Sequence, residues 1–427
     1  MNFPPQIYSI LEILWQLFKS WWWVLPVFLL WEPFLFIYRW SRIEKYDATV
    51  KRILLEIKLP KEVVKPVKAM ETVFAGIHAI HDVFTWRELW IEGQYQLAFS
   101  FEIVSLGGDI HFYIRTPEVF RKIIESNVYS QYPEAEIFEV SDYTKSVPQN
   151  IPTKDWDLFG MDLVNTKDEV YPLKTYVNFE QDNTLEEKRI DPLSNLLEGF
   201  SALRPGEQLW MQIIAKPIRE EKPWIKRGKE IRDQLARRTN PKAKPKSMLQ
   251  EAFEIVVLGE VPEKKEEKKE VMPPEMKLTP GEREVLTAIE NKISKFGYDC
   301  NIRFIYLGKR DVFFKPMARV PYTFFKAISS ESMGGLKPDK HTITKVKSVF
   351  FWLLDNRRVY FRKRRMFRYY CRRMTPHFPV SGGTYVFNVE ELATLYHFPG
   401  KTMAPASNLA RIEAKKGEAP PQLPIEF

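Results

Sequence analysis

The feature that most constrains the fold is a nearly uninterrupted apolar run, WWWVLPVFLLWEPFLFIY, between Trp21 and Tyr38. As a helix, these roughly 18 residues would extend about 27 Å, close to the hydrocarbon thickness of a bilayer. Both ends of the run carry aromatic side chains of the kind that collect at membrane–water interfaces. The six aromatic residues that we expect to anchor the chain are Trp21, Trp22, Trp23, Trp31, Tyr38 and Trp40. The run therefore predicts a transmembrane helix.

Basic residues are much denser after this run than before it. Only Lys19 precedes the run, whereas five basic residues soon follow it: Arg39, Arg42, Lys45, Lys51 and Arg52. Because basic residues favour the cytoplasmic side of a membrane, the chain should cross the inner (cytoplasmic) membrane once. Everything after residue 40 is then expected in the cytoplasm.

Other interpretations of the run stay open. Glu32 beside Pro33 places a charge and a helix breaker inside it, which also fits a re-entrant or interface-parallel segment. A buried helix of a soluble protein is a second alternative. A cleaved signal peptide fits poorly, because no basic segment precedes the run and no small-residue cleavage site follows it.

The rest of the chain has the composition of a folded, basic protein. Of its 427 residues 44% are hydrophobic, which is enough for a substantial core. The net charge of +9 favours acidic partners such as nucleic acid or anionic lipid. The chain has only two cysteines, Cys300 and Cys371, and they provide no disulfide framework and no thiolate metal site.

Changes in composition predict six parts along the chain. They are a membrane anchor (1–45), a first α+β unit (46–145), a connecting region with the start of a second unit (146–260), a charged linker (261–276), the second unit (277–389, with a basic-aromatic insertion at 349–373), and a C-terminal helix with an extended connector (390–427). The linker, VPEKKEEKKEVMPPEM, is almost purely charged residues and proline, so it cannot bury a core.

The order of secondary structure predicts an α+β fold. Between residues 50 and 141, strand-like and helix-like runs follow the order β-α-β-β-α-β, which is the ferredoxin-like motif with an antiparallel sheet. A second copy is expected because residues 100–124 and 302–328 share a strand, a Leu-Gly turn, a second strand, a proline and an amphipathic helix. Farther along, Thr279-Pro280-Gly281-Glu282 has the spacing of a capping box that starts a helix. We therefore predict duplicated ferredoxin-like units with antiparallel sheets.

The sequence contains no recognisable catalytic or cofactor-binding arrangement. The phosphate-binding pattern G-x-x-x-x-G-K-[ST] is absent. His78 and His81 have the spacing of metal ligands on a helix, but no third histidine lies near them in the sequence. We therefore expect a protein that is not an enzyme and that needs no cofactor or metal.

A basic-aromatic stretch, RRVYFRKRRMFRYYCRR, is the strongest candidate for a binding surface. We expect eight of its arginines to face an acidic partner: Arg357, Arg358, Arg362, Arg364, Arg365, Arg368, Arg372 and Arg373. Arginines interleaved with aromatic rings can bind phosphates and stack on bases, and they suit anionic lipid headgroups equally well. A partner protein or a solvated face, a lipid surface and a nucleic acid all stay open.

The C-terminal segment FNVEELATLYHFPGKTMAPASNLARIEAKKGEAPPQLP resembles a junction found in the conjugative-transfer ATPases of type IV secretion systems. In that family a similar segment closes a membrane-proximal N-terminal region and leads to the motor. The positions that match are Asn388, Glu390, Glu391, Leu392, Ala393, Leu395, Tyr396, His397 and Pro399. The resemblance implies that all of these except Asn388 and Ala393 dock the ATPase. Nearly the whole chain looks like an uncharacterised membrane-anchored family that is common in candidate-phyla bacteria.

This resemblance implies association with a secretion or DNA-transfer ATPase rather than an activity of the chain itself. No nucleotide-binding sequence appears before Phe427, so the motor is either a separate polypeptide or part of a longer chain. We expect a membrane-tethered, non-enzymatic adaptor that positions a separate ATPase, in several copies if the motor is a ring. The alternative is a nucleic-acid-binding module that guides DNA to a membrane pore.

Overall fold

The computed structural model describes residues 15–16, 19–21, 24–60, 65–180, 191–218, 223–236, 278–347, 352–374 and 384–400. The chain divides into two compact units. The first comprises Met1–Arg52 and Asp82–Leu97, and the second comprises Ile53–His81 and Ala98–Phe427. Three sequence predictions lie outside the described residues: the anchoring role of Trp22 and Trp23, the linker at 261–276, and the connector beyond residue 400.

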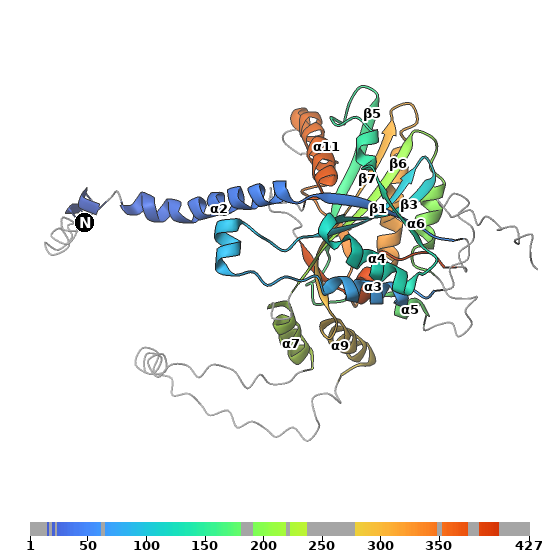
Figure 1. The fold of residues 1–427 in the computed structure, drawn as a ribbon, viewed down its shortest axis with the longest axis horizontal. Coiled ribbons are helices and arrows are strands. Elements are labelled where there is room, and N and C mark those ends of the chain that lie inside the picture. The colour runs from blue at the N-terminus through green and yellow to red at the C-terminus, as the bar shows by residue number, and fades with distance from the viewer. Residues whose placement is uncertain are drawn as a thin grey trace, which may run out of the picture. The chain divides into compact units, whose positions relative to one another are not determined.

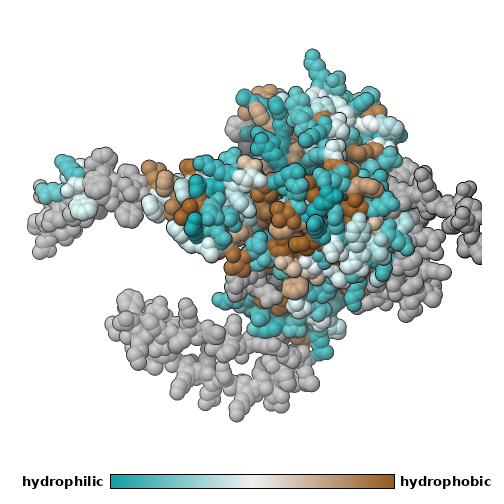
Figure 2. All heavy atoms as spheres, in the orientation of Figure 1, coloured by the Kyte–Doolittle hydropathy of each residue, from teal (hydrophilic) through white to brown (hydrophobic). Residues whose placement is uncertain are grey.

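The first unit is built on a long helix, α2 (Val24–Thr49), which runs through Pro33 (Figure 1). Its C-terminal half is amphipathic, with Arg42, Ile43, Tyr46 and Asp47 partly buried at helical spacing. Its described N-terminal half is apolar and exposed, and Figure 2 shows hydrophobic residues (brown) at the surface along this helix. Among the described residues, no helix combines the length and the apolar character needed to cross a membrane.

The second unit is organised around one nine-stranded sheet (Figure 1). The strands are β1 (Arg52–Lys58), β2 (Phe99–Leu106), β3 (Asp109–Pro117), β4 (Glu136–Val140), β5 (Trp156–Asn165), β6 (Glu207–Pro217), β7 (Gly297–Lys309), β8 (Leu336–Pro338) and β9 (Tyr385–Asn388). Their order is β4-β1-β3-β2-β6-β7-β5-β8, and β9 pairs with the end of β7. The pairings β1–β4, β2–β3, β2–β6, β5–β7, β5–β8, β6–β7 and β7–β9 are antiparallel.

Helices pack on both faces of this sheet, because alternate residues of each strand point to opposite faces. The larger core lies on the face where β6 places Leu209 and Met211. The helices that contribute buried side chains to it are α3 (Lys68–His78), α4 (Arg121–Gln131), α5 (Tyr176–Glu180), α6 (Ser194–Ser201), α10 (Val320–Ala327) and α12 (Val389–Leu395). On the opposite face, Trp210 packs in a smaller core with α11 (Asp355–Arg372) and the 3₁₀ helix η3 (Tyr143–Ser146).

Two further helices, α7 (Pro223–Leu235) and α9 (Pro280–Ile293), form a small cluster of their own. Trp224 of α7 is buried there against Ile218 and Val386, with Ile293 of α9 packed alongside. The α9 helix begins with the predicted capping box: the Thr279 side chain accepts from Glu282 N, and the Glu282 carboxylate accepts from Thr279 N at 2.8 Å. This start is confirmed.

The mixed α+β class is confirmed, but one continuous antiparallel sheet replaces the separate sheets that we expected. The expectation of a second strand after Gly308 is wrong. There the amides of Val312 and Phe313 both donate to Lys309 O, at 3.0 and 2.8 Å, and turn the chain into a 3₁₀ helix, η6 (Lys315–Arg319). The antiparallel neighbour of β7 is instead β6, which ends about 80 residues before β7 begins.

Candidate functional site

The basic-aromatic stretch folds as the 18-residue helix α11. Its apolar side chains Met366, Phe367 and Tyr370 recur at helical spacing and are buried against the sheet. The Tyr370 ring lies 5.3 Å from that of Trp210 on β6. The apolar stripe thus turns most of the cations of α11 away from the sheet.

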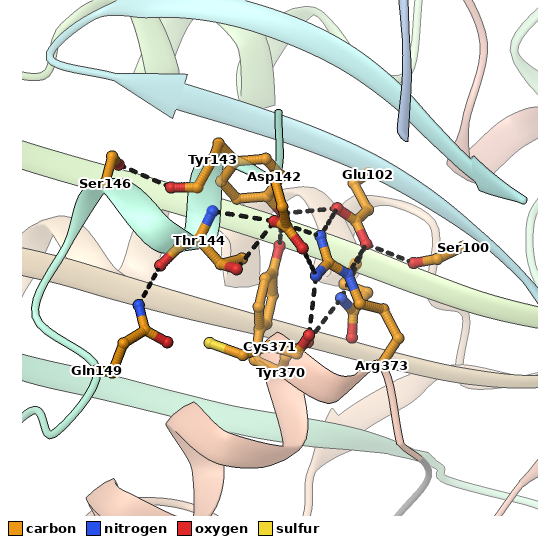
Figure 3. A network of polar contacts seen from close by, with 11 residues as sticks. Ser100, Glu102, Asp142, Tyr143, Thr144, Ser146, Gln149, Tyr370, Cys371 and Arg373 are labelled. Carbon is orange, nitrogen blue, oxygen red and sulfur yellow. Dashed lines mark hydrogen bonds and ion pairs between the residues drawn. The ribbon is translucent and has the colours of Figure 1, made fainter. Parts of the chain in front are cut away.

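The helix ends at Arg373, which adopts a left-handed conformation with φ 52°. Its guanidinium is buried between two carboxylates (Figure 3). Arg373 Nε lies 2.9 Å from Glu102 Oε1 on β2, and Arg373 Nη1 lies 2.5 Å from Asp142 Oδ2, just before η3. The end of α11 is therefore joined to two segments that are remote in the sequence.

Glu102 is fully buried, and its carboxylate accepts hydrogen bonds from several side chains. Ser100 Oγ donates to it at 2.6 Å, Tyr143 OH at 2.7 Å and Gln212 Nε2 at 3.0 Å. Burial alone would raise the pKa of Glu102, but the charge and hydrogen bonds of Arg373 hold that pKa below its usual value. Because these bonds leave the carboxylate fully partnered, the network is a structural lock rather than a reactive centre.

Beside this lock lies a groove of about 560 Å³. One wall is α11 and the other is the segment from Asp142 to Ile151. Its side chains are Asp142, Thr144, Lys145, Gln149, Ile151, Phe361, Arg364, Phe367, Arg368, Cys371 and Arg372. Figure 3 shows the inner end of this region, where Cys371 lies near the lock and the Thr144 and Gln149 side chains come from the opposite segment.

The groove is lined by four cations that are not neutralised by any acidic side chain among the described residues. Arg364, Arg368 and Arg372 follow one another at a spacing of four residues, which places them on one stripe of α11, and Lys145 lies on the facing segment. Within the described part of the chain, none of the four forms an ion pair. The arrangement can therefore bind a chain of negative charges.

The remaining predicted arginines have other roles. Arg362 Nη1 donates to Ile343 O at 3.0 Å and Arg365 Nη2 donates to His341 O at 3.4 Å. Both arginines therefore bind the loop of the second unit (the body) that contains His341 and Ile343. Arg358 lies 4.0 Å from Asp355, and the Arg357 guanidinium lies 5.7 Å from the centroid of the Phe361 ring. The expectation that Arg373 faces a partner is wrong, because its side chain is buried in the lock.

Like charges crowd along α11 despite these contacts. Burial, followed by the neighbouring charges of Arg365 and Arg358, lowers the pKa of Arg362. A nearby anion would relieve such repulsion. Among the described residues, no group of three or more histidine, cysteine or acidic side chains is placed to hold a metal ion.

Comparison with protein families gives one match. Residues 42–323 match the family described as "Domain of unknown function (DUF8128)". The chain belongs to the DUF8128 family. No curated protein matches it. The DUF8128 region includes Glu102, Asp142 and Lys145, whereas α11 and α12 follow its last matched residue.

The segment after the DUF8128 region that we expected to dock an ATPase is largely buried. Glu391, Leu392, Leu395, Tyr396 and His397 have no exposed surface. Asn388 and Glu391 form a second capping box that starts α12. These five side chains are packed inside the second unit and do not themselves form a surface that a partner could contact.

Ion pairs hold this segment in place. Lys292 Nζ lies 3.0 Å from Glu391 Oε2 with both side chains fully buried, and Lys295 Nζ lies 2.6 Å from Glu390 Oε2. Burial raises the pKa of Glu391, against the opposing effect of Lys292. His397 Nε2 lies 2.9 Å from Asp191 Oδ1.

The predicted membrane-anchoring side chains that the structure describes are all exposed. They are Trp21, Trp31, Tyr38 and Trp40. Leu29, Leu30, Phe34, Phe36 and Ile37 are exposed with them on α2.

Sequence reasoning missed Glu102, Asp142 and Lys145. A signal for Glu102 existed, because the run FSFEIV places one carboxylate inside an otherwise apolar strand. A buried carboxylate requires a cation or several donors. The sequence does not indicate which of 64 lysines and arginines supplies it.

Proposed function

We propose that this protein is a membrane-tethered, non-enzymatic adaptor that positions a separate motor ATPase of the secretion or conjugation type at the inner membrane. The observation that carries the proposal is the N-terminal half of α2. Its apolar side chains from Leu29 to Ile37 are exposed around most of the helix circumference, with Leu29 78% exposed. Glu32 is the one charged residue of this stretch. Apolar side chains exposed around the rest of the helix need an apolar environment, and a bilayer supplies one.

We further propose that the body is a duplicated ferredoxin-like scaffold. The strand order supports this, because β4-β1-β3-β2 is the order of that motif and β8-β5-β7-β6 repeats it. The helices fit the same scheme: α3 and α4 connect strands of the first copy, and α6 and α10 connect strands of the second. In this scheme α7 and α9 lie in an insertion between β6 and β7.

The attachment of the motor is proposed for the segment that begins after α12. The two capping-box bonds of Asn388, 2.8 and 3.0 Å long, and the buried pair Lys292–Glu391 fix the last helix in the core. Pro399, which cannot continue a helix, follows it. A connector that leaves from so rigid a point would hold a motor at a defined place on the body.

Co-purification tests the adaptor. Affinity-tagged full-length protein should sediment with membranes and, after detergent extraction, retain a polypeptide that carries a phosphate-binding G-x-x-x-x-G-K-[ST] motif. A chain lacking residues 401–427 should still sediment with membranes but should no longer retain that polypeptide. Leu30→Ser/Ile37→Ser should release the protein from membranes, whereas Val119→Ser/Leu353→Ser, which changes two exposed apolar residues of the body, should not. Fractionation of the unaltered protein with cytosol, or recovery of lipid alone, would refute the proposal.

A second candidate function is binding of single-stranded nucleic acid. The observation that favours it is the groove, in which Lys145, Arg364, Arg368 and Arg372 form no ion pair within the described part of the chain. The Phe361 ring, which also lines the groove, is exposed. Cationic side chains along a groove bind the phosphates of a single strand, and aromatic side chains stack on its bases. Binding of a labelled oligonucleotide should weaken steeply as salt rises, and no binding at low salt would exclude this function.

A further inference from the structure

Residues 82–97 of the first unit are held against the C-terminal half of α2. Arg42 Nε donates to Ile91 O at 2.6 Å, and the Arg39 guanidinium lies 5.5 Å from the centroid of the Trp90 ring. Gly93 has φ 75°, and a Cβ at that position would lie 2.3 Å from Arg42 O. This close approach fixes the level of the segment along α2, beside residues 39–42.

The segment also has internal structure that makes it rigid. Thr85 N donates to the Glu88 carboxylate at 2.7 Å, which starts a helical turn that includes η1 (Glu88–Glu92). Gln94 N then closes the turn by donating to Glu88 O at 2.8 Å. At its base, Tyr95 hydrogen-bonds to Asp47 of α2.

This rigid turn exposes apolar side chains that the unit itself does not cover. Trp86 is 69% exposed and Ile91 is 43% exposed, and Val83, just before the turn, is 67% exposed. A stable soluble surface rarely concentrates an exposed tryptophan with two aliphatic residues in so short a segment. These three side chains therefore call for a covering surface outside the unit.

The position of the turn along α2 indicates what covers these side chains. The exposed apolar part of α2 ends near Tyr38 and Trp40, and Arg42 lies about 6 Å farther along the helix axis than Tyr38. If the apolar half of α2 lies in hydrocarbon, the turn lies at the depth of the headgroups. Tryptophan and arginine collect at that depth.

Charge argues for an apolar contact rather than an electrostatic one. The segment carries Asp82, Glu88 and Glu92 against one basic residue, Arg87, whose Nε lies 3.3 Å from Glu92 Oε1. An anionic surface would gain little from this balance. A basic protein partner would be attracted to the carboxylates, and its binding would weaken with salt.

We propose that residues 82–97 form an interfacial segment that lies in the headgroup region of the membrane and covers Val83, Trp86 and Ile91 with lipid. The inference rests on the proposed tether through α2. It adds a second contact that sets how far α2 enters the bilayer, because the segment is bonded to α2 at Arg42 and Asp47.

Site-specific labelling of the full-length protein tests this depth. An environment-sensitive fluorophore is placed at Leu30→Cys, Trp86→Cys or Val119→Cys in a Cys371→Ser background, in which the remaining Cys300 is buried. Each protein is reconstituted into phosphatidylcholine–phosphatidylglycerol vesicles that carry a quencher either at the headgroup or deep in the acyl chain. Val119, 84% exposed on the body, provides the reference for an apolar residue outside the segment.

We expect the deep quencher to act most strongly at position 30 and the headgroup quencher to act most strongly at position 86, with little change in high salt. If position 30 is quenched but position 86 is quenched no more than the reference position 119, the interfacial segment is refuted. The tether through α2 is not refuted by that result. Absence of quenching at both positions would overturn the tether and the segment together. Quenching at position 86 that high salt abolishes would also refute the apolar contact.

Discussion

The Arg373 guanidinium lies 2.9 Å from the Glu102 carboxylate, although 271 residues separate the two in the sequence. The contact joins the end of α11 to β2 in the middle of the sheet, and Asp142 completes it from the segment that forms the opposite wall of the groove. One buried cation therefore fixes both walls of the groove relative to each other. The arrangement of the surface arginines depends on a residue that cannot itself contact a ligand.

Removal of this cation should destabilise the protein strongly. Arg373→Met leaves Glu102 and Asp142 as carboxylates without their cation, and loss of one partner of a buried pair typically costs about 3–5 kcal/mol. Glu102→Gln in the same protein should recover part of the loss, because it removes one of the unpaired charges. Thermal unfolding of the two variants measures both effects. Arg358→Met on the exposed side of α11 is the control and should change the stability by less than about 0.5 kcal/mol.

The same network predicts the response to acid. The pKa values of Glu102 and Asp142 are lowered in the folded protein, because Arg373 outweighs the effect of burial. Their contribution to stability is therefore present above the unfolded pKa values, about 4, and is lost as the pH falls below them. The melting temperature should drop steeply in that range. The Glu102→Gln/Asp142→Asn variant should show a shallower dependence, and an unchanged slope would contradict the network.

The groove should account for most of the affinity for a polyanion. Replacement of Arg364, Arg368 and Arg372 by glutamine removes three cations from one stripe, so binding of a labelled single-stranded oligonucleotide should fall. The slope of log affinity against log salt should decrease by about 0.7 for each phosphate that the variant no longer neutralises. Arg357→Gln/Arg358→Gln, on the same helix but outside the groove, is the control. Equally weakened binding in both proteins would show that charge alone, and not the groove, directs binding.

The contact between the interfacial segment and α2 should depend on Gly93. Gly93→Ala requires a left-handed backbone that costs on the order of 1–2 kcal/mol for other residues, and its Cβ would clash with Arg42 O. Limited proteolysis should cut residues 82–97 faster in this variant. Gly281→Ala, where no atom lies within 4 Å of the new Cβ, should leave the cleavage rate of this segment unchanged.

Local patterns in the sequence predicted local structure correctly. Thr279 and Glu282 predicted the start of α9 because a capping box needs only the right residues three positions apart. The antiparallel, mixed α+β character also followed from apolar runs and turn residues. Those signals act over a few residues. The pattern after Gly308 is the exception, because the chain turns there into η6 and does not form the expected strand.

Features that depend on distant pairing could not be predicted in this way. The β5 strand was missed because Asp157, Gly160 and Asp162 interrupt its apolar pattern. Asp162 is nevertheless buried, since Arg303 of the neighbouring β7 lies 2.9 Å from it. The groove was missed for the same reason: its two walls are separated by about 200 residues, and nothing in the sequence indicates that they meet.

The antiparallel pairing of β2 with β6, from Phe99 opposite Ala215 to Leu106 opposite Gln208, has a consequence for how the protein can be divided. A cut of the polypeptide in the loop between β4 and β5 would separate these two strands and strip each of a neighbour. Both fragments would then present a long, apolar, unsatisfied edge, which is a template for self-association. The smallest fragment that stays soluble must therefore contain the whole sheet. A domain boundary near residue 146 would separate β2 from β6.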